Sequence, residues 1–452
     1  MRGLRLVRWF YPGLGVKRWL LVATGGAILL VNGIFRLLTG EGIVIPINEL
    51  VDGIVDDYFS PTLLAPIFIA LGLLGVFYGI REWTQAIANA VTPAGGHRIV
   101  DALLKHRKRN GYKVVAIGGG TGLSTLLRGL KHYTSNITAI VTVSDDGGSS
   151  GRLRKELGVL PPGDIRNCLV ALADDEALVT DLFRYRFSEG EGLSGHSFGN
   201  LFLAAMTGIT GNFEEAIRES SRVLNIIGRV LPATLTSVKL CATLRDGSII
   251  EGESQIGQAA QPIDSVYFEP AQAPPLPDVL EAIRDADAIV LGPGSLFTSI
   301  VPNLLVSGMV EALTASKAVK IYVCNVMTQP GETEGLSAGE HLQALLRALG
   351  QPTAHQLIDY ILVNDEKPTL LVERYAQERQ EPVQIDTELL EALGVRSKCA
   401  AVMSESENVR HDPNKLARVV VELVDDVLKA RASYIRSTLP HETQTRIPKE
   451  AI

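Results

Sequence analysis

The sequence predicts a doubly wound α/β domain with a mostly parallel sheet, preceded by two membrane-spanning helices. Three observations support this prediction: two long apolar runs near the start, short β-rich runs that then alternate with helical patterns, and glycine-rich turns after several of those runs. Alternation of strands and helices is typical of a sheet covered by helices on both faces. With 452 residues, 46% of them hydrophobic, the chain has room for an anchor and one large domain or two ordinary ones.

Charge and cysteine content argue against two classes of protein. A formal net charge of -7 is unlike that of nucleic-acid-binding proteins, whose Lys and Arg cluster on one face. The four cysteines, Cys168, Cys241, Cys324 and Cys399, show no CxxC spacing. Neither a zinc site nor a disulfide framework is therefore indicated, and we expect reduced core thiols and no nucleic-acid partner.

The sequence predicts that residues 1–80 form a membrane anchor with helices at about 19–35 and 63–80. The second run is uncharged over 18 residues, close to what a hydrocarbon core of about 30 Å requires. A signal peptide is the alternative for the first run. However, no small-residue cleavage site follows it, and a second apolar run does.

The charges beside the two runs predict the orientation. The first 18 residues and the stretch after the second run carry bases, whereas the loop 39–62 carries five acids and no base. Cytoplasmic segments are enriched in Lys and Arg. We therefore expect a protein of the plasma (inner) membrane with both termini and the main domain in the cytoplasm, and helices that only anchor it.

A basic connector, residues 81–112, leads to a domain at 113–432 and a polar tail at 433–452. The domain has five apolar β-rich runs, at 113–117, 137–144, 288–292, 321–326 and 360–364. Continuous rather than alternating hydrophobicity indicates strands buried on both faces. Helical periodicity appears at 338–350 and after Asp412-Pro413, and Asp246-Gly247 predicts a β-hairpin insertion within 234–253.

Ligands of open α/β sheets bind beyond the carboxyl ends of the strands. The segment after the first strand contains Gly118, Gly119, Gly120, Thr121 and Gly122. Its glycines let the backbone approach a phosphate, and the following helix offers amide hydrogens. The residues after Gly122 match neither the dinucleotide-binding fingerprint nor the Walker pattern. A tight turn without a ligand is the alternative.

The segment after the second strand carries adjacent carboxylates, Asp145 and Asp146, and then a loop with Gly147, Gly148 and Ser149. One aspartate could bind a ribose hydroxyl. Because two carboxylates repel a phosphate unless a cation lies between them, we also expect Mg²⁺ as a candidate cofactor with Asp145 and Asp146 as its ligands. An Asx turn that solvates itself is the alternative.

Further polar residues extend the predicted crevice. They are Asp164, Arg166 and Asn167 on a Pro-Gly turn, His196 and Asn200 between glycines, Gly292, Gly294 and Ser295 after another strand, and Asn325, which opens a loop that includes Glu332. Arg166 could bind phosphate oxygens. A core or capping role is the alternative for His196, and a plain surface loop for 325–335. No Ser-His-Asp order, HExxH or GxSxG element appears, so no catalytic residue is assigned.

The motifs together resemble the gluconeogenesis-factor (YvcK-like) family, a branch of the CofD-like superfamily. They are "AIGGGTGLSTLLRGLK", "VTVSDDGGSSGRLR", "PPGDIRNCLVALA", "GHSFGNL", "LGPGSLFTSI" and "NVMTQPGETEG". The resemblance runs from residue 114 to about 427 and implies a three-layer, Rossmann-like fold with a nucleotide crevice. Most such proteins are described as soluble and cytoplasmic, which is the alternative localisation.

The resemblance implies two competing functions. One is a regulator that binds a UDP-sugar such as UDP-N-acetylglucosamine and is needed for cell shape and wall synthesis during gluconeogenic growth. The other is a Mg²⁺-dependent transferase of the 2-phospho-L-lactate transferase type, which uses a guanosine diphosphate carrier and a deazaflavin acceptor. "DDGGSSGRLR" and "VMTQPGET" resemble the regulatory branch, which we favour. We also expect a homo-oligomer and cell-wall synthesis proteins as partners.

Overall fold

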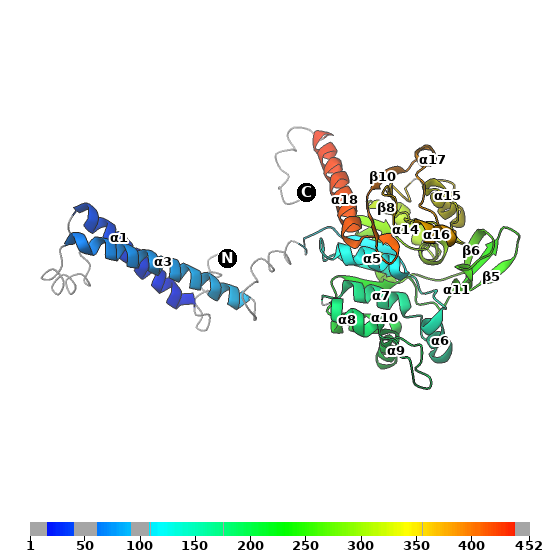
Figure 1. Ribbon diagram of the computed structural model, residues 1–452, viewed down its shortest axis with the longest axis horizontal. Helices are drawn as coiled ribbons and strands as arrows, with labels where there is room; N and C mark the ends of the chain where they lie inside the picture. The colour runs from blue at the N-terminus through cyan, green and yellow to red at the C-terminus, as the bar shows by residue number, and fades with distance from the viewer. Residues whose placement is uncertain are drawn as a thin grey trace. The chain divides into compact units, whose positions relative to one another are not determined.

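The computed structural model describes residues 16–39, 61–91, 108, 110–174, 176–354 and 356–438. The chain divides into two compact units, Met1–His106 and Arg107–Ile452 (Figure 1). Most of the predicted acidic loop 39–62, residues 92–107 and 109 of the predicted connector, and the tail beyond residue 438 lie outside the described residues.

The N-terminal unit consists of two helices, α1 (Val16–Thr39) and α3 (Pro61–Val91). Both are long and apolar enough to cross a membrane, over Arg18–Leu38 and Ala65–Gln85. Helix α3 continues past Ile80, the predicted end of the anchor, because no Pro or Gly interrupts the chain until Pro93.

Glycines allow α1 and α3 to pack closely against each other. A Cβ atom on Gly26 would lie 2.5 Å from the backbone nitrogen of Val76, and one on Gly72 would lie 2.5 Å from that of Leu30. Small residues at such a contact are typical of membrane helices. Large apolar side chains point outward along both helices, among them Leu38 at 78% exposure, as expected for helices that face lipid.

The second unit contains the predicted parallel sheet, which has seven strands in the order β10-β9-β8-β7-β1-β2-β3. The strands are β1 (Val114–Gly118), β2 (Ile137–Val141), β3 (Arg229–Pro232), β7 (Ala288–Leu291), β8 (Val319–Val323), β9 (Tyr360–Asn364) and β10 (Arg396–Ala400). The mostly parallel, doubly wound fold is confirmed. Sequence analysis missed β3 and β10 because they are edge strands with partly exposed residues.

Helices cover both faces of this sheet (Figure 1). The helices described in this unit are α5 (Gly120–Leu130), α6 (Gly148–Leu157), α7 (Gly163–Leu172), α8 (Glu176–Arg184), α9 (Phe198–Thr210), α10 (Phe213–Val223), α11 (Glu253–Ile256), α12 (Pro277–Arg284), η2, a π-helical turn (Leu296–Ile300), α13 (Val301–Leu304), α14 (Met309–Ala315), α15 (Ala338–Ala348), α16 (Val372–Gln377), α17 (Thr387–Ala392) and α18 (Pro413–Thr438). Along β1, Val115 and Ile117 pack into one core, and Val114 and Ala116 into the other. The sheet is therefore the middle of three layers.

Two smaller sheets flank the main one. The hairpin predicted at Asp246-Gly247 is present as β4 (Lys239–Leu244) and β5 (Ile249–Glu251), and β6 (Ile263–Glu269) joins it on the other side of β4. A second hairpin, β11 (Met403–Glu405) and β12 (Val409–His411), was not predicted. Helix α18 begins at Pro413 as predicted but continues past Ala432, where we had placed the tail.

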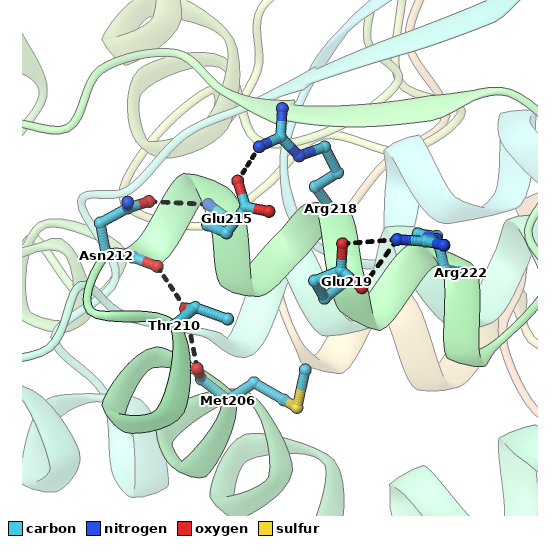
Figure 2. A network of polar contacts seen from close by, with 7 residues as sticks. All are labelled: Met206, Thr210, Asn212, Glu215, Arg218, Glu219 and Arg222. Carbon is cyan, nitrogen blue, oxygen red and sulfur yellow. Dashed lines mark hydrogen bonds and ion pairs between the residues drawn. The ribbon is translucent and has the colours of Figure 1, made fainter.

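The connection from α9 to α10 shows how local polar contacts set helix ends (Figure 2). Helix α9 ends at Thr210, and Gly211 after it adopts the left-handed conformation. The Asn212 side chain then accepts a hydrogen bond from the Glu215 amide at 2.7 Å. The Thr210 hydroxyl donates to the Asn212 carbonyl at 3.0 Å. These contacts cap both helices, whereas the exposed ion pairs along α10 contribute little.

Gly129 tests the packing of α5 against α18. An added Cβ atom would overlap the backbone carbonyl of Pro413, so we expect Gly129→Ala to lower the free energy of unfolding by about 1–3 kcal/mol. Gly208 is the matched control, since it lies in α9 with nothing within 4 Å of an added Cβ atom. There, alanine should stabilise by about 0.5–1 kcal/mol. Thermal denaturation of the full-length protein in detergent measures both, and equal midpoints would contradict the packing.

Candidate functional site

A cleft of about 310 Å³ lies at the carboxyl ends of β1, β7 and β8. Four segments line it: the turn after β1 (Gly119 to Gly122, with Thr125), the turn after β7 (Pro293 to Ser295, with Ser299), the loop after β8 (Asn325 to Met327, with Gln329), and the hairpin residues Val409 to His411. The first three follow strands at the same edge of the sheet. Sequence analysis could not find the fourth, because its residues form no motif.

The glycine turn joins β1 directly to α5. Gly119 is extended, and Gly120 has a φ of +60°, a conformation that favours glycine. The first-turn amides of Thr121 and Gly122 have no acceptor within the helix, whereas the Gly120 amide donates to the Asp164 carboxyl. The free amides and the helix dipole together favour a bound anion.

The turns after β1 and β7 are in direct contact. A Cβ atom on Gly122 would overlap the Pro293 carbonyl and would lie 3.0 Å from the Gly294 Cα atom. The Gly294 amide donates to Asn325 Oδ1 at 3.3 Å, and Asn325 Nδ2 donates to Gln329 at 3.2 Å. Asn325, which sequence analysis placed in the site, therefore lines the cleft and also holds its second turn.

Ser295 lies in a compact cluster of hydrogen bonds at the start of η2. Its Oγ accepts from the Thr298 amide at 3.1 Å and from the Thr298 hydroxyl at 2.6 Å, and it donates to Glu332 Oε2. The Phe297 amide also donates to Glu332, at 3.3 Å. Burial raises the pKa of Glu332. Glu332, a polar residue of the loop that the sequence placed beside the crevice, thus fixes the turn that carries Ser295.

A layer of carboxyl groups lies directly behind the glycine turn. A Cβ atom on Gly119 would lie 2.5 Å from Asp164 Oδ2. Burial, followed by the charge of Asp145, raises the pKa of Asp164 to about 7. Burial, followed by the charge of Asp164, raises the pKa of Glu253 well above its usual value, and Glu253 also accepts from Ser144 at 3.3 Å. Sequence analysis missed Glu253 because only the tertiary fold brings the β4–β5 hairpin to β2.

The adjacent carboxylates Asp145 and Asp146 make different contacts. Asp145 Oδ1 accepts from the Gly147 amide at 2.9 Å, the Asx turn that we had kept as an alternative, and Asp146 Oδ1 accepts from the Ser254 amide at 2.9 Å. Within the described part of the chain, no group of three or more His, Cys, Asp or Glu side chains is arranged to hold a metal ion. Because Mg²⁺ often binds through one or two carboxylates and ligand phosphates, these residues fit only an ion that a phosphate helps to hold.

The polar residues of α6, α7 and α9 form a buried network outside the cleft. The Arg166 guanidinium donates to Ser197 at 2.7 Å, Asn200 at 3.0 Å and Asn167 at 2.9 Å, and so it is held by protein groups. His196 Nδ1 lies 2.9 Å from Ser149 Oγ, to which Asn200 also donates at 3.1 Å. Burial, then the charge of Arg152, lowers the pKa of His196. The predicted crevice is thus a cleft with a separate polar layer behind it.

The raised pKa of Asp164 predicts how stability changes with pH. Stabilisation by its neutral form is complete below the ordinary pKa of 3.8 and is lost as pH rises through about 7. Asparagine resembles the neutral form at every pH. The stability of Asp164→Asn relative to wild type should therefore increase between about pH 4 and about pH 7, by at most about 4 kcal/mol.

Denaturation curves across that pH range measure the effect. The control is Asp285→Asn, which changes an aspartate with 49% exposure. A parallel pH profile for Asp164→Asn and wild type would show that the Asp164 carboxyl titrates at its ordinary pKa.

Comparisons with known proteins agree with this geometry. The family model described as 2-phospho-L-lactate transferase CofD matches residues 114–403. The gluconeogenesis factor of Bacillus subtilis (strain 168) is 51% identical over 316 residues, which cover 70% of this chain and 98% of the relative. A relative from Nostoc sp. (strain PCC 7120) is 50% identical over 421 residues, or 92% of each chain, so this likeness reaches into the N-terminal unit.

Solved structures show the same fold. The crystal structure of a UPF0052 family member from Bacillus halodurans has a TM-score of 0.65 and 51% sequence identity, and the match covers 69% of this chain and 99% of the solved one. The matched model includes β1, β2, β7 and β8 with the turns that form the cleft. The chain therefore belongs to the CofD family and, within it, to the gluconeogenesis factors.

Proposed function

We propose that this gluconeogenesis factor is a regulatory protein that binds a nucleotide sugar of the UDP-N-acetylglucosamine type in the cleft. The observation that carries the proposal is the contact between the glycine turn after β1 and the Pro293 turn after β7. Together they offer a diphosphate a helix N-terminus on one side and a second close backbone approach on the other. A nucleotide diphosphate is the ligand class that such a pair of turns fits.

Each part of the ligand has a candidate partner. The amides of Thr121 and Gly122 would bind the diphosphate, and the Gly294–Ser295 turn would close over it. The apolar side chains of Val326, Met327 and Val409 would face the base or the sugar. Asp145 and Asp146 do not line the cleft wall. A ribose hydroxyl, or a Mg²⁺ ion shared with the diphosphate, would have to extend from the cleft toward them, and that ion would neutralise phosphate charge.

The ionisable groups of the cleft favour binding over turnover. Among the residues that line it, only Arg410 and His411 have ionisable side chains. Burial lowers the pKa of His411 to about 4, so it is neutral near pH 7. The carboxyl groups lie behind the glycine turn instead. The cleft wall thus presents no carboxylate that could serve as a general base or a nucleophile.

The second candidate function is a transferase of the 2-phospho-L-lactate transferase type. The matched family model carries that description, and the partly buried carboxyls of Asp164 and Glu253 favour it, because raised pKa values occur often at catalytic sites. In such an enzyme, Asp145 and Asp146 would hold a metal ion that stabilises charge on the phosphoryl oxygens. His196 and Asn200 would then belong to the acceptor side.

The two apolar helices would place the domain at the cytoplasmic face of the plasma membrane, where wall precursors are assembled. We propose this location, with a role in cell shape and wall synthesis during gluconeogenic growth, wall-synthesis proteins as partners and a homo-oligomeric state.

After fractionation of cells, the full-length protein should sediment with membranes and resist carbonate extraction. A variant that begins at Arg98 should be soluble. Full-length protein in the soluble fraction would contradict the location.

Gly122→Ala tests the ligand site. The added methyl group would force the two turns apart, and a loss of about 1.4 kcal/mol or more corresponds to at least about tenfold weaker binding of UDP-N-acetylglucosamine. Isothermal titration of the full-length protein, with and without Mg²⁺, measures this, with Gly208→Ala as the control. Mass spectrometry of the recovered ligand should show no turnover. Preference for GDP with strict Mg²⁺ dependence would favour the transferase, and equal affinity in the variant would exclude this cleft.

A further inference from the structure

A second pocket of about 270 Å³ lies beside the first cleft, on the other side of the Ser295 turn. The end of β4, the loop 259–263, the loop 331–336 and one face of α15 line it. The loops pack tightly here: a Cβ atom on Gly331 would lie 2.7 Å from the Ala259 carbonyl. The pocket shares Glu332 and Phe297 with the hydrogen-bonded cluster around Ser295. Neither the comparisons nor the proposed function assigns a ligand to this pocket.

The formal charges of the pocket lining cancel, since it contains three arginines and three glutamates, but two of the arginines have donors to offer an anion. Its three acids are already engaged: Glu332 with Ser295 and the Phe297 amide, Glu334 with Arg379 at 3.7 Å, and Glu340 with the Ser337 amide at 2.8 Å in a helix capping box. Two arginines of the lining, Arg245 and Arg347, have no side-chain hydrogen bond or ion pair to other described residues. Guanidinium groups with unused donors bind phosphate and carboxylate groups well.

Part of the pocket lining is apolar, and it includes Ile263, Phe297 and Leu336. An inorganic ion would leave these groups unused, whereas a small organic anion would cover them while its charged end meets the arginines. The chemistry thus fits a compact metabolite with a phosphomonoester or several carboxylates and a short carbon skeleton.

Glu332 provides a direct physical link between the two sites. Its carboxyl group lines the second pocket and accepts hydrogen bonds from the Ser295 hydroxyl and the Phe297 amide, while Ser295 lines the first cleft. An anion that enters beside Glu332 would repel its carboxylate and disturb both bonds. The position of the Ser295 turn would then depend on the occupancy of the second pocket.

We propose that this second pocket is an effector site for a small organic anion, and that Glu332 acts as a positioning residue that transmits its occupancy to the Ser295 turn. The first half of this proposal, the effector site, is independent of the ligand of the main cleft. The second half, the role of Glu332, rests on the proposed function, because it predicts a change in nucleotide-sugar affinity.

Direct binding tests the first half. Glycerol 3-phosphate and citrate are titrated into the full-length protein in detergent. At least one should bind saturably, and Arg245→Ala combined with Arg347→Ala should weaken its binding by about tenfold or more, the effect of losing one charge-assisted hydrogen bond. Both arginines are exposed, so the double variant should fold.

The matched control is Arg284→Ala, which removes a guanidinium of 73% exposure that is paired with Asp285 outside this pocket. Its affinity should equal that of the wild type. No saturable binding of either probe, or equal weakening in the control, would overturn the effector site.

The second half is tested with UDP-N-acetylglucosamine in the presence and absence of the saturating probe. Typical coupling energies predict about a fivefold or larger change in affinity. In Glu332→Ala the probe should still bind while the change disappears. Persistent coupling in that variant would overturn the role of Glu332. If the nucleotide sugar fails to bind even without the probe, the proposed function is wrong, while the titration of the anion still decides the first half.

Discussion

The contact between Gly122 and the Pro293 carbonyl is the constraint on which the candidate site depends. No side chain fits between the turns after β1 and β7, so the backbone of α5 reaches the edge of the cleft. Asn325 and Glu332 hold the second turn from two directions, through the Gly294 amide and the Ser295 hydroxyl. The position of the cleft thus follows from backbone packing between adjacent parallel strands, and side chains only secure it.

Behind these turns, polar groups replace the usual apolar packing. Asp164 supports the glycine turn through the Gly120 amide, and desolvation of its carboxyl raises its pKa. Arg166, Asn200 and Ser149 continue the layer through hydrogen bonds within the protein. Arg166 Nε is buried without a hydrogen-bond partner among the described residues, so the layer is not fully satisfied. Its hydrogen bonds join residues of α6, α7 and α9 behind the cleft. We infer that it positions the phosphate-binding turn.

Much of the fold could be predicted from the sequence, and the reason is burial. The strands β1, β2, β7 and β8 are buried at every residue, so they appear as continuous apolar runs, whereas the partly exposed edge strands β3 and β10 do not. The glycine turn was predictable because its chemistry is local. Glu253 and Val409 were not, since distant segments bring them to the site. The different contacts of Asp145 and Asp146 also depend on a distant residue, Ser254.

Hydrogen exchange reports directly on the backbone amides proposed to bind the nucleotide sugar. Full-length protein is compared with and without UDP-N-acetylglucosamine, and exchange is followed by mass spectrometry. Peptides that contain Thr121 and Gly122, and those that contain Gly294 and Ser295, should both become protected, while peptides of α10 should not change. Protection confined to other segments, or none at saturating ligand, would contradict the assignment of the two turns as the nucleotide-sugar site.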